Sequence, residues 1–515
     1  MYQKFFVRKK ELPIEYVIKS TMNLTEQELN QCSELFSNNY GYYGKEDPKG
    51  RAGKPIKMGT GYYKRHYLKP DYYVALAIYQ GVIIAQAFYI KKFYKKEGNI
   101  TWVLQLVVHR KYRKRRIASK LLHSIWGFSN DHAWGLATAN PCTVRTLERA
   151  TFRKANPKTI KKHLDTIKRV GDEINFVCDY VVDDTKSLVN TKFFIDISEK
   201  RNEIEENSID DDWRLGGLEP GYEWLAFTFK GQELSPDSKK YFKEFVSFSE
   251  NQLKDAYSRM RMKKQPWTKH TSSEVDFIED FCNLNSSQKI LDIGCGFGRH
   301  SIEFGKRNYT VTGLDFSEKN IKQAREASSG LDNVSFFCCD CRKIKLTEKF
   351  DVALALYDVI GSFPNNTENI KLIKQAYKYL KHGGVFILSV MNMELTQNLA
   401  NKNRIGDVNN NIKLLLDLKP SNIMQQTGDV FDPEYYVIDS KHHLVYRKEQ
   451  FENDGNLSAE YVIRDRRYTE KEICEILNKV GFRVCDVRCV SAGHWDQPLK
   501  STHLKAKEIL VIARK

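Results

Sequence analysis

A glycine-rich turn near the middle of the chain separates a strand pattern from a helix pattern. The run Leu291-Asp-Ile-Gly-Cys-Gly-Phe-Gly-Arg-His300 opens with apolar residues typical of a strand end and continues into a predicted helix. Its glycines, at 294, 296 and 298, let the backbone pass close to a ligand. Asp315 follows 17 residues after the last glycine, at the end of the next predicted strand, where a carboxylate can accept hydrogen bonds from both ribose hydroxyls. The pattern predicts a site for a nucleoside-containing cofactor.

The sequence around this turn alternates predicted strands with predicted helices. The expected strands cover 289–293, 310–314, 334–338, 350–356 and 384–390, and the expected helices cover 299–307, 317–328 and 366–381. This alternation is typical of a parallel sheet that carries helices on both faces. We therefore expect the C-terminal half to form a doubly wound, Rossmann-like α/β domain.

Residues 251–515 resemble the class I S-adenosylmethionine-dependent methyltransferases. An acid, Asp292, stands just before a Gly-x-Gly-x-Gly turn, as in that family, whereas nicotinamide cofactors favour Gly-x-Gly-x-x-Gly. The alternatives are another dinucleotide-binding protein and a domain without its cofactor. The resemblance implies that S-adenosylmethionine is bound by Asp292, Gly294, Gly296, Gly298, Asp315, Asp340 and Leu356.

The same resemblance implies a task for each position. The glycine turn passes the methionine part of the cofactor with Asp292 near its ammonium group, Asp315 holds the ribose, and Asp340 takes the adenine amino group. Tyr357 and Asp358 follow the fourth strand, where the family places residues beneath the reactive methyl, and they are the candidate catalytic residues. Their alternative role is a pocket wall, because methyl transfer needs a general base only when the nucleophile arrives protonated.

The methyl acceptor is less constrained by the sequence. Amino-methyltransferases of DNA have Asn/Asp-Pro-Pro-Tyr/Phe where this chain has Tyr357-Asp-Val-Ile360. Arg299-His300 and the helix start at 467–473 are more similar to small-molecule N- and O-methyltransferases. The inserted residues 392–450 are expected to cover the substrate. His442 and His443 in this insert can act as bases, and the alternative is that they are exposed strand histidines.

The N-terminal third carries the whole positive excess. Residues 1–180 contain 33 Lys and Arg against 15 Asp and Glu, while the whole chain has a formal charge of +17. This imbalance predicts an anionic partner, either cofactor phosphates or a nucleic acid or both. A hairpin at 72–88, a strand at 100–109, a basic loop at 110–116 and a helix from 117 to about 128 indicate a mixed α+β fold.

Residues 71–154 resemble the acyl-CoA-binding core of the GNAT acetyltransferase superfamily. The family's Arg/Gln-x-x-Gly-x-Gly/Ala loop reads Arg113-Lys-Arg-Arg116-Ile-Ala118, and Asn140 with Leu147-Glu-Arg-Ala-Thr-Phe152 fits most of its second signature. Leu147 stands where many members have a proton-donating tyrosine, so acyl transfer would need another acid. A solvated basic turn and a nucleic-acid contact are alternative interpretations of the loop. The resemblance implies that acetyl-CoA or another acyl-CoA is bound by Arg113, Arg115, Arg116, Ala118 and Asn140.

Length and composition indicate several domains. A chain of 515 residues exceeds the roughly 250–300 residues at which a single core stops growing. We expect a GNAT-like domain at 1–180, an extension and helical connection at 181–250, and a methyltransferase domain at 251–515. No stretch of about 18 apolar residues predicts a membrane span. Eleven cysteines without a secretory signal predict structural thiols, no bound metal and a cytoplasmic protein.

Together these features predict a bifunctional cytoplasmic enzyme. It would join a methyltransferase acting on the nitrogen or oxygen of a small molecule to a GNAT-like acyltransferase domain. The alternative is a methyltransferase that modifies tRNA or DNA, with the basic N-terminal domain recognising the nucleic acid.

Overall fold

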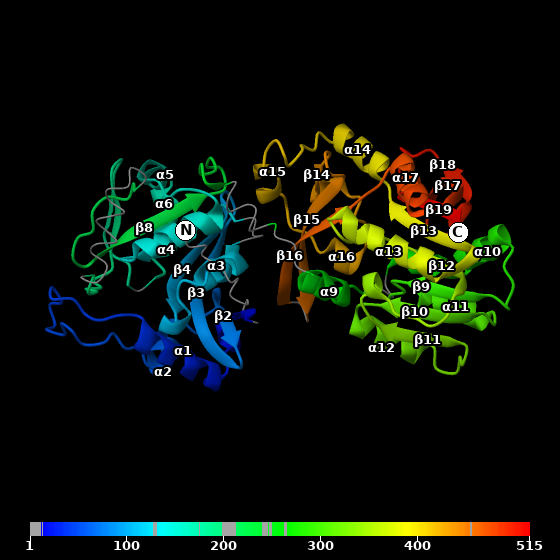
Figure 1. Cartoon of the computed structure of the whole chain (residues 1–515). Helices are drawn as coiled ribbons and strands as arrows, with labels where there is room; N and C mark the ends of the chain where they lie inside the picture. Colours follow the sequence, from blue (N-terminus) through cyan, green and yellow to red (C-terminus); the bar gives the residue numbers. More distant parts are fainter. Residues whose placement is uncertain are drawn as a thin grey trace, which may run out of the picture. The chain divides into compact units, whose positions relative to one another are not determined.

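The computed structural model divides the chain into two compact units (Figure 1). Unit 1 comprises Met1–Phe245 with Asn453–Ser458, and unit 2 comprises Val246–Glu452 with Ala459–Lys515. The described residues are 12, 14–126, 131–174, 176–197, 213–238, 246, 250–261, 265–453 and 456–515. The predicted end of the helix near 128 and, within the predicted extension and connection at 181–250, residues 198–212, 239–245 and 247–249 lie outside them.

Eight strands of the described part of unit 1 form one sheet, in the order β1-β2-β3-β4-β5-β8-β7-β6. Their bounds are β1 Glu15–Ser20, β2 Tyr72–Tyr79, β3 Val82–Tyr94, β4 Gly98–Val108, β5 Ala133–Thr138, β6 Tyr180–Val182, β7 Ser187–Asn190 and β8 Tyr222–Phe229. The antiparallel pairing of β2 with β3 confirms the predicted hairpin. β4 and β5 run parallel, and their register covers only 100–103 against 133–136. Unit 1 extends past residue 180 because β8 pairs with β5 and β7 pairs with β8.

Helices cover both faces of this sheet. Successive strand residues point to opposite sides, and apolar residues on each side pack against helices. Val74 and Leu76 pack with the residues of α1 and α2, whereas Ala75 and Ala77 pack with Leu121 of α3. The helices are α1 Glu26–Asn39, α2 Thr60–His66, α3 Ile117–Trp126, α4 Pro141–Thr151, α5 Pro157–Lys162 and α6 Leu164–Gly171. Two cores therefore fix the sheet and the loops at its ends.

Unit 2 contains a second sheet of eight described strands, in the order β11-β10-β9-β12-β13-β19-β17-β18 (Figure 1). Their bounds are β9 Lys289–Ile293, β10 Thr310–Asp315, β11 Val334–Cys338, β12 Phe350–Ala355, β13 Leu380–Met391, β17 Arg483–Ser491, β18 His494–Leu499 and β19 Glu508–Arg514. The strands from β11 to β13 are parallel, and β19 runs antiparallel to β13. This arrangement confirms the predicted α/β sheet.

Apolar residues of β9 alternate between two cores, so this sheet is also covered on both faces. Ile290 packs with residues of α10, α11 and α12, whereas Leu291 packs with residues of α13 and α17. These helices are α10 Thr271–Cys282, α11 Arg299–Lys306, α12 Glu318–Ala327, α13 Asn366–Tyr379 and α17 Glu470–Val480. A strand buried on both faces reads as a nearly continuous apolar run, which is why the sequence located these strands.

Two predicted boundaries in unit 2 are wrong by a few residues. The helix expected to reach 381 ends at Tyr379, and the strand expected to begin at 384 begins at Leu380. A register shift in the pairing of β12 with β13 accounts for the difference, since Phe350 faces Leu380 while Val352 faces Val385. The irregular stretch Lys381–Gly384 is polar and glycine-rich, so it carries no strand signal.

The insert between β13 and α17 forms a small subdomain. Three strands, β14 Val437–Asp439, β15 Leu444–Asn453 and β16 Asn456–Arg466, make a sheet in chain order. The surrounding helices are α9 Glu250–Arg259, α14 Met393–Lys402, α15 Lys413–Leu416 and α16 Ile423–Gln426. Of the described helices, none combines the length and apolar character that crossing a membrane requires.

Candidate functional site

The glycine turn lies at the carboxyl edge of the parallel strands, between the end of β9 and the start of α11. Gly294 has φ +73°, and a Cβ there would lie 2.5 Å from Val359 Cγ2. Gly298 has φ +80°, and a Cβ there would lie 2.6 Å from the Phe336 ring. Both the backbone conformation and the lack of space require glycine at these two positions. In open α/β sheets, ligands bind at this edge, at the point where the strand order reverses. Here that point is beside β9, because the next strand in sequence, β10, lies on one side of β9 and β12 lies on the other.

Asp315 ends β10 beside this turn. Its Oδ2 accepts a hydrogen bond from the Gly296 amide at 3.0 Å, and its Oδ1 accepts one from the Ser317 amide at 2.7 Å. Burial raises the pKa of this carboxyl to about 6. Asp315 also lines a cavity of about 90 Å³ with Phe316 and Asn320. The residue therefore holds the glycine turn in shape and faces the space beside it.

Asp340 lines the same cavity and belongs to a network of charges centred on Arg342. The Arg342 guanidinium pairs with Asp340 at 2.8 Å, with Glu250 at 2.9 Å and with Glu368 at 2.7 Å. Hydrogen bonds from Arg342 lower the pKa of Asp340, so the carboxylate stays ionised. Arg342 thus fixes the orientation of Asp340 at the rim of the cavity.

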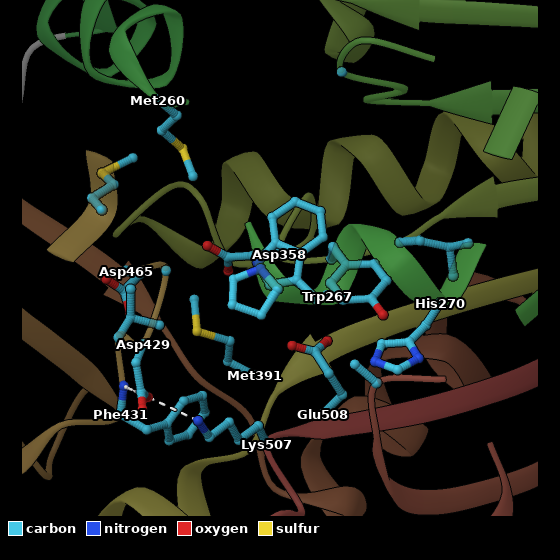
Figure 2. Close-up of a pocket in the computed structure, with 18 of the residues that line it drawn as sticks. Met260, Trp267, His270, Asp358, Met391, Asp429, Phe431, Asp465, Lys507 and Glu508 are labelled. Carbon is cyan, nitrogen blue, oxygen red and sulfur yellow. Dashed lines mark hydrogen bonds and ion pairs between the residues drawn. The ribbon is translucent and has the colours of Figure 1, made fainter. Parts of the chain in front are cut away.

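A much larger cavity, of about 1030 Å³, begins at Gly294 and Gly296. Figure 2 shows part of its lining. Asp292 and Leu356 line it as well. The Asp292 carboxylate accepts a hydrogen bond from Ser301 Oγ at 2.6 Å, and burial raises its pKa to about 6. All seven residues assigned to S-adenosylmethionine lie at or beside the carboxyl edge of the sheet, and six of them, all but Gly298, line one cavity or the other.

Tyr357 and Asp358 line both cavities and therefore mark their junction. Their φ angles are +58° and +65°, a left-handed conformation that costs energy in residues with side chains and is concentrated at functional sites. The Tyr357 hydroxyl donates to Glu274, and its ring stacks on Trp267 with centroids 5.1 Å apart. Burial raises the pKa of Tyr357 well above its usual value, so the phenol remains protonated. Tyr357 thus has the character of a fixed wall.

Glu274 organises this wall from helix α10. Its carboxylate accepts hydrogen bonds from Arg299 at 2.7 Å and from His300 at 2.8 Å, besides that from Tyr357. Burial acts to raise the pKa of Glu274, but the hydrogen bond from His300 and the charge of Arg299 outweigh it, so the pKa is lowered. Glu274 is absent from the sequence-based assignment, because a polar position on an amphipathic helix gives no sign of which residues it will meet.

The insert contributes part of the wall of the large cavity. Met424 and the stretch 427–431 line it, as do Arg447 of β15 and Asp465 of β16. The two predicted histidine bases lie elsewhere: His442 pairs with Asp439 at 2.8 Å and His443 pairs with Glu472 at 2.8 Å. Neither lines a described cavity, and both lie in the turn between β14 and β15 rather than in a strand.

In unit 1, the predicted acyl-CoA loop lies between β4 and α3. The Arg113 guanidinium donates to the backbone oxygens of Val108 at 3.1 Å and Asn39 at 2.5 Å, so this side chain ties the loop to its surroundings. Arg115 and Arg116 are exposed, and Ala118 lies in the first turn of α3. Asn140 caps α4 by accepting a hydrogen bond from the Cys142 amide at 3.1 Å. Arg113 and Asn140 therefore have structural roles that the sequence assignment did not include.

Residues 284–429 match a family described as "Methyltransferase domain". Curated relatives match over shorter lengths. "Putative methyltransferase YqeM" of Bacillus subtilis is 28% identical over 109 residues, which cover 21% of this chain and 44% of the relative. "Glycine/sarcosine N-methyltransferase" of Aphanothece halophytica is 26% identical over 132 residues, which cover 25% of this chain and 50% of the relative. The chain thus spans about half, or less, of the length of these relatives.

Among solved structures, the CcbJ methyltransferase of Streptomyces caelestis aligns with a TM-score of 0.35 and 16% identity. The alignment covers 47% of this chain and 88% of that one. Residues 284–429 are thus similar to a methyltransferase domain.

Proposed function

We propose that unit 2 is an S-adenosylmethionine-dependent methyltransferase. One observation carries the proposal: Asp315 and the glycine turn face a small cavity that joins a much larger one at Tyr357 and Asp358. The nucleoside of the cofactor would lie beside Asp315 and Asp340, and its methionine part would extend past Gly294 and Gly296, which line both cavities. When bound, the cofactor supplies a methyl group whose bond to the sulfonium breaks as the acceptor atom forms its new bond, leaving a neutral thioether.

The chain's own residues supply position and exclude water. Glu274 holds Tyr357, and Trp267 stacks on its ring, so the wall beside the junction is rigid. Most catalytic benefit in such a displacement comes from aligning the reacting groups in a dry site. A cavity of about 1030 Å³ supports a small molecule as the methyl acceptor, since ligand pockets usually enclose about 300–1,000 Å³.

The binding of S-adenosylmethionine should weaken below about pH 6. A carboxylate accepts hydrogen bonds from hydroxyls best when ionised, and the pKa of Asp315 is raised to about 6. Protonation at pH 5 should therefore weaken the affinity roughly tenfold relative to pH 7.5. The stability of the ligand-free protein depends on pH in the opposite direction. Because the folded protein keeps the Asp315 proton to a higher pH than the unfolded chain does, this carboxyl lowers the free energy of unfolding as the pH rises from about 4 to 6. Calorimetric titration at three pH values measures the first effect.

The Asp315→Asn variant is the control for this pH dependence. Because its amide does not titrate, the ratio of affinities at pH 7.5 and pH 5 should shrink. An unchanged ratio in this variant would assign the effect to another group.

A second proposal concerns unit 1, which we propose binds an acyl-CoA. The observation that favours it is the parallel pair β4 and β5, whose register ends at Val103 and Leu136 while β4 continues to Val108. The chain then runs through the basic loop into the N-terminus of α3, a position that attracts phosphate. Coenzyme A would place its pyrophosphate there.

Replacing both Lys114 and Arg115 with Ala tests this second proposal without disturbing the hydrogen bonds of Arg113. Both residues are exposed, and removing two cations should weaken coenzyme A binding by roughly tenfold or more in a calorimetric titration. Transfer RNA at low salt serves as the competing ligand. Salt-sensitive RNA binding without coenzyme A binding would replace the acyl-CoA proposal with nucleic-acid recognition.

A further inference from the structure

Two carboxylates in the large cavity of unit 2 keep an oxygen without a hydrogen-bond partner. Within the described part of the chain, Asp358 Oδ1 and Glu508 Oε2 are buried and accept no hydrogen bond. The other oxygen of Asp358 accepts one from the Tyr257 hydroxyl at 3.2 Å. Buried polar atoms of native proteins nearly always have partners, so two open carboxylate oxygens in one cavity indicate a missing donor.

Two other acids of the cavity, Asp465 and Asp429, already have cationic partners. Asp465 pairs with Arg447 and also with Arg467, which lies 3.2 Å away. Asp429 pairs with Lys507 at 2.8 Å, as the dashed line in Figure 2 shows. Asp292, the remaining acid of the cavity, accepts a hydrogen bond from Ser301, so Asp358 and Glu508 are the two acids among the described lining residues that keep a buried oxygen without a partner.

The charge of Glu508 also acts on Asp358. Burial raises the pKa of Asp358 well above its usual value, and the charges of Asp465 and Glu508 raise it further. Burial raises the pKa of Glu508 to about 7. Neighbouring carboxyl groups in an apolar cavity resist ionising together, and a cation bound between them removes that resistance.

The remaining walls suit an apolar molecule that carries such a cation. Trp267, Met391 and Phe431 surround the same cavity (Figure 2). Met391 and Phe431 are buried, and the ring of Trp267, which stacks on Tyr357 and lies near Arg299, adds further apolar surface.

We propose that the methyl acceptor is an apolar primary or secondary amine whose ammonium group binds between Asp358 and Glu508. This inference rests on the proposed methyltransferase function and adds the substrate class. The ammonium donates hydrogen bonds to Asp358 Oδ1 and Glu508 Oε2. Asp358, at the junction of the two cavities, accepts one N–H proton, and the electron pair of that bond stays on nitrogen as the lone pair that forms the new bond to the methyl carbon. The carboxylate becomes a carboxylic acid, and the nitrogen becomes the methylated ammonium.

Calorimetric titration of the full chain, saturated with S-adenosylhomocysteine, tests the inference. Phenethylamine and hexylamine are the probes, and 2-phenylethanol and hexanol are their uncharged matches. The amines should bind roughly tenfold to a hundredfold more tightly than the alcohols, the range of hydrogen bonds to charged groups. Asp358→Asn combined with Glu508→Gln should abolish this preference, whereas Glu434→Gln, which removes an exposed carboxylate paired with Lys419 and outside both cavities, should leave it within about threefold.

The outcomes distinguish a failure of the amine assignment from a failure of the proposed methyltransferase function. Amines that bind no better than alcohols, or probes that do not bind at all to the saturated protein, overturn the amine assignment alone. Failure of S-adenosylhomocysteine to bind overturns the methyltransferase function itself. Melting temperatures keep the variants interpretable, because an amide in place of an unpaired buried carboxylate should not lower them. A preference for amines that persists in the double variant also contradicts the proposal.

Discussion

Asp315→Ala should weaken the binding of S-adenosylmethionine by roughly tenfold or more, the effect of losing charge-assisted hydrogen bonds. The variant loses the carboxylate that faces the nucleoside cavity. It also leaves the Gly296 amide without the acceptor that now lies 3.0 Å away, so the glycine turn loses support. Both losses act in the same direction, and a calorimetric titration measures the sum.

The matched control for this variant is Asp332→Ala. Asp332 is exposed and lines neither described cavity, so the change in net charge is the same while the site is untouched. Its affinity for S-adenosylmethionine should equal that of the unmodified chain. Equal affinities of the Asp315→Ala and Asp332→Ala variants would remove Asp315 from the binding site.

Arg447→Met should lower the free energy of unfolding of unit 2 by about 3–5 kcal/mol, the usual cost of removing one partner from a buried ion pair. Arg447 is 3% exposed and pairs with two buried acids, Glu449 at 3.1 Å and Asp465. Methionine fills most of the volume but leaves both carboxylates with fewer donors. Chemical denaturation of the full chain measures the effect. The unfolding transition of unit 2 is the one that should move to higher denaturant concentration when S-adenosylmethionine is added.

Arg483→Met is the comparison for this second variant, because Arg483 is exposed at the start of β17. A surface substitution of this kind should change the free energy of unfolding by less than about 0.5 kcal/mol. If Arg447→Met lowers the free energy of unfolding by less than about 1 kcal/mol, then Glu449 and Asp465 do not depend on Arg447 for their stability in the folded chain.

Local patterns in the sequence were sufficient for much of the fold of unit 2. Apolar runs located β9, β10 and β12, because strands covered on both faces need continuous apolar residues. The glycines at 294 and 298 carried a requirement for positive φ that only glycine meets without strain. The start of β13 was missed, because Lys381–Gly384 joins the strand through an irregular register and not through its composition.

The large cavity could not be predicted in the same way. Tyr257, Asp358, Asp465 and Glu508 are separated by up to about 250 positions along the chain, and only the sheet and the insert bring them together. Glu508 begins an apolar strand, where an isolated acid was the one available signal. Similarly, Arg113 matched a loop motif by residue type, although its guanidinium is bonded to the backbone oxygens of Val108 and Asn39.

The structure of the full chain crystallised with S-adenosylhomocysteine would show whether unit 2 binds the cofactor at the glycine turn. The ribose hydroxyls should lie within hydrogen-bond distance of Asp315, the adenine should lie beside Asp340, and the thioether sulfur should point toward Asp358. Density for the ligand at any other place in unit 2, or none at saturating concentration, would contradict it.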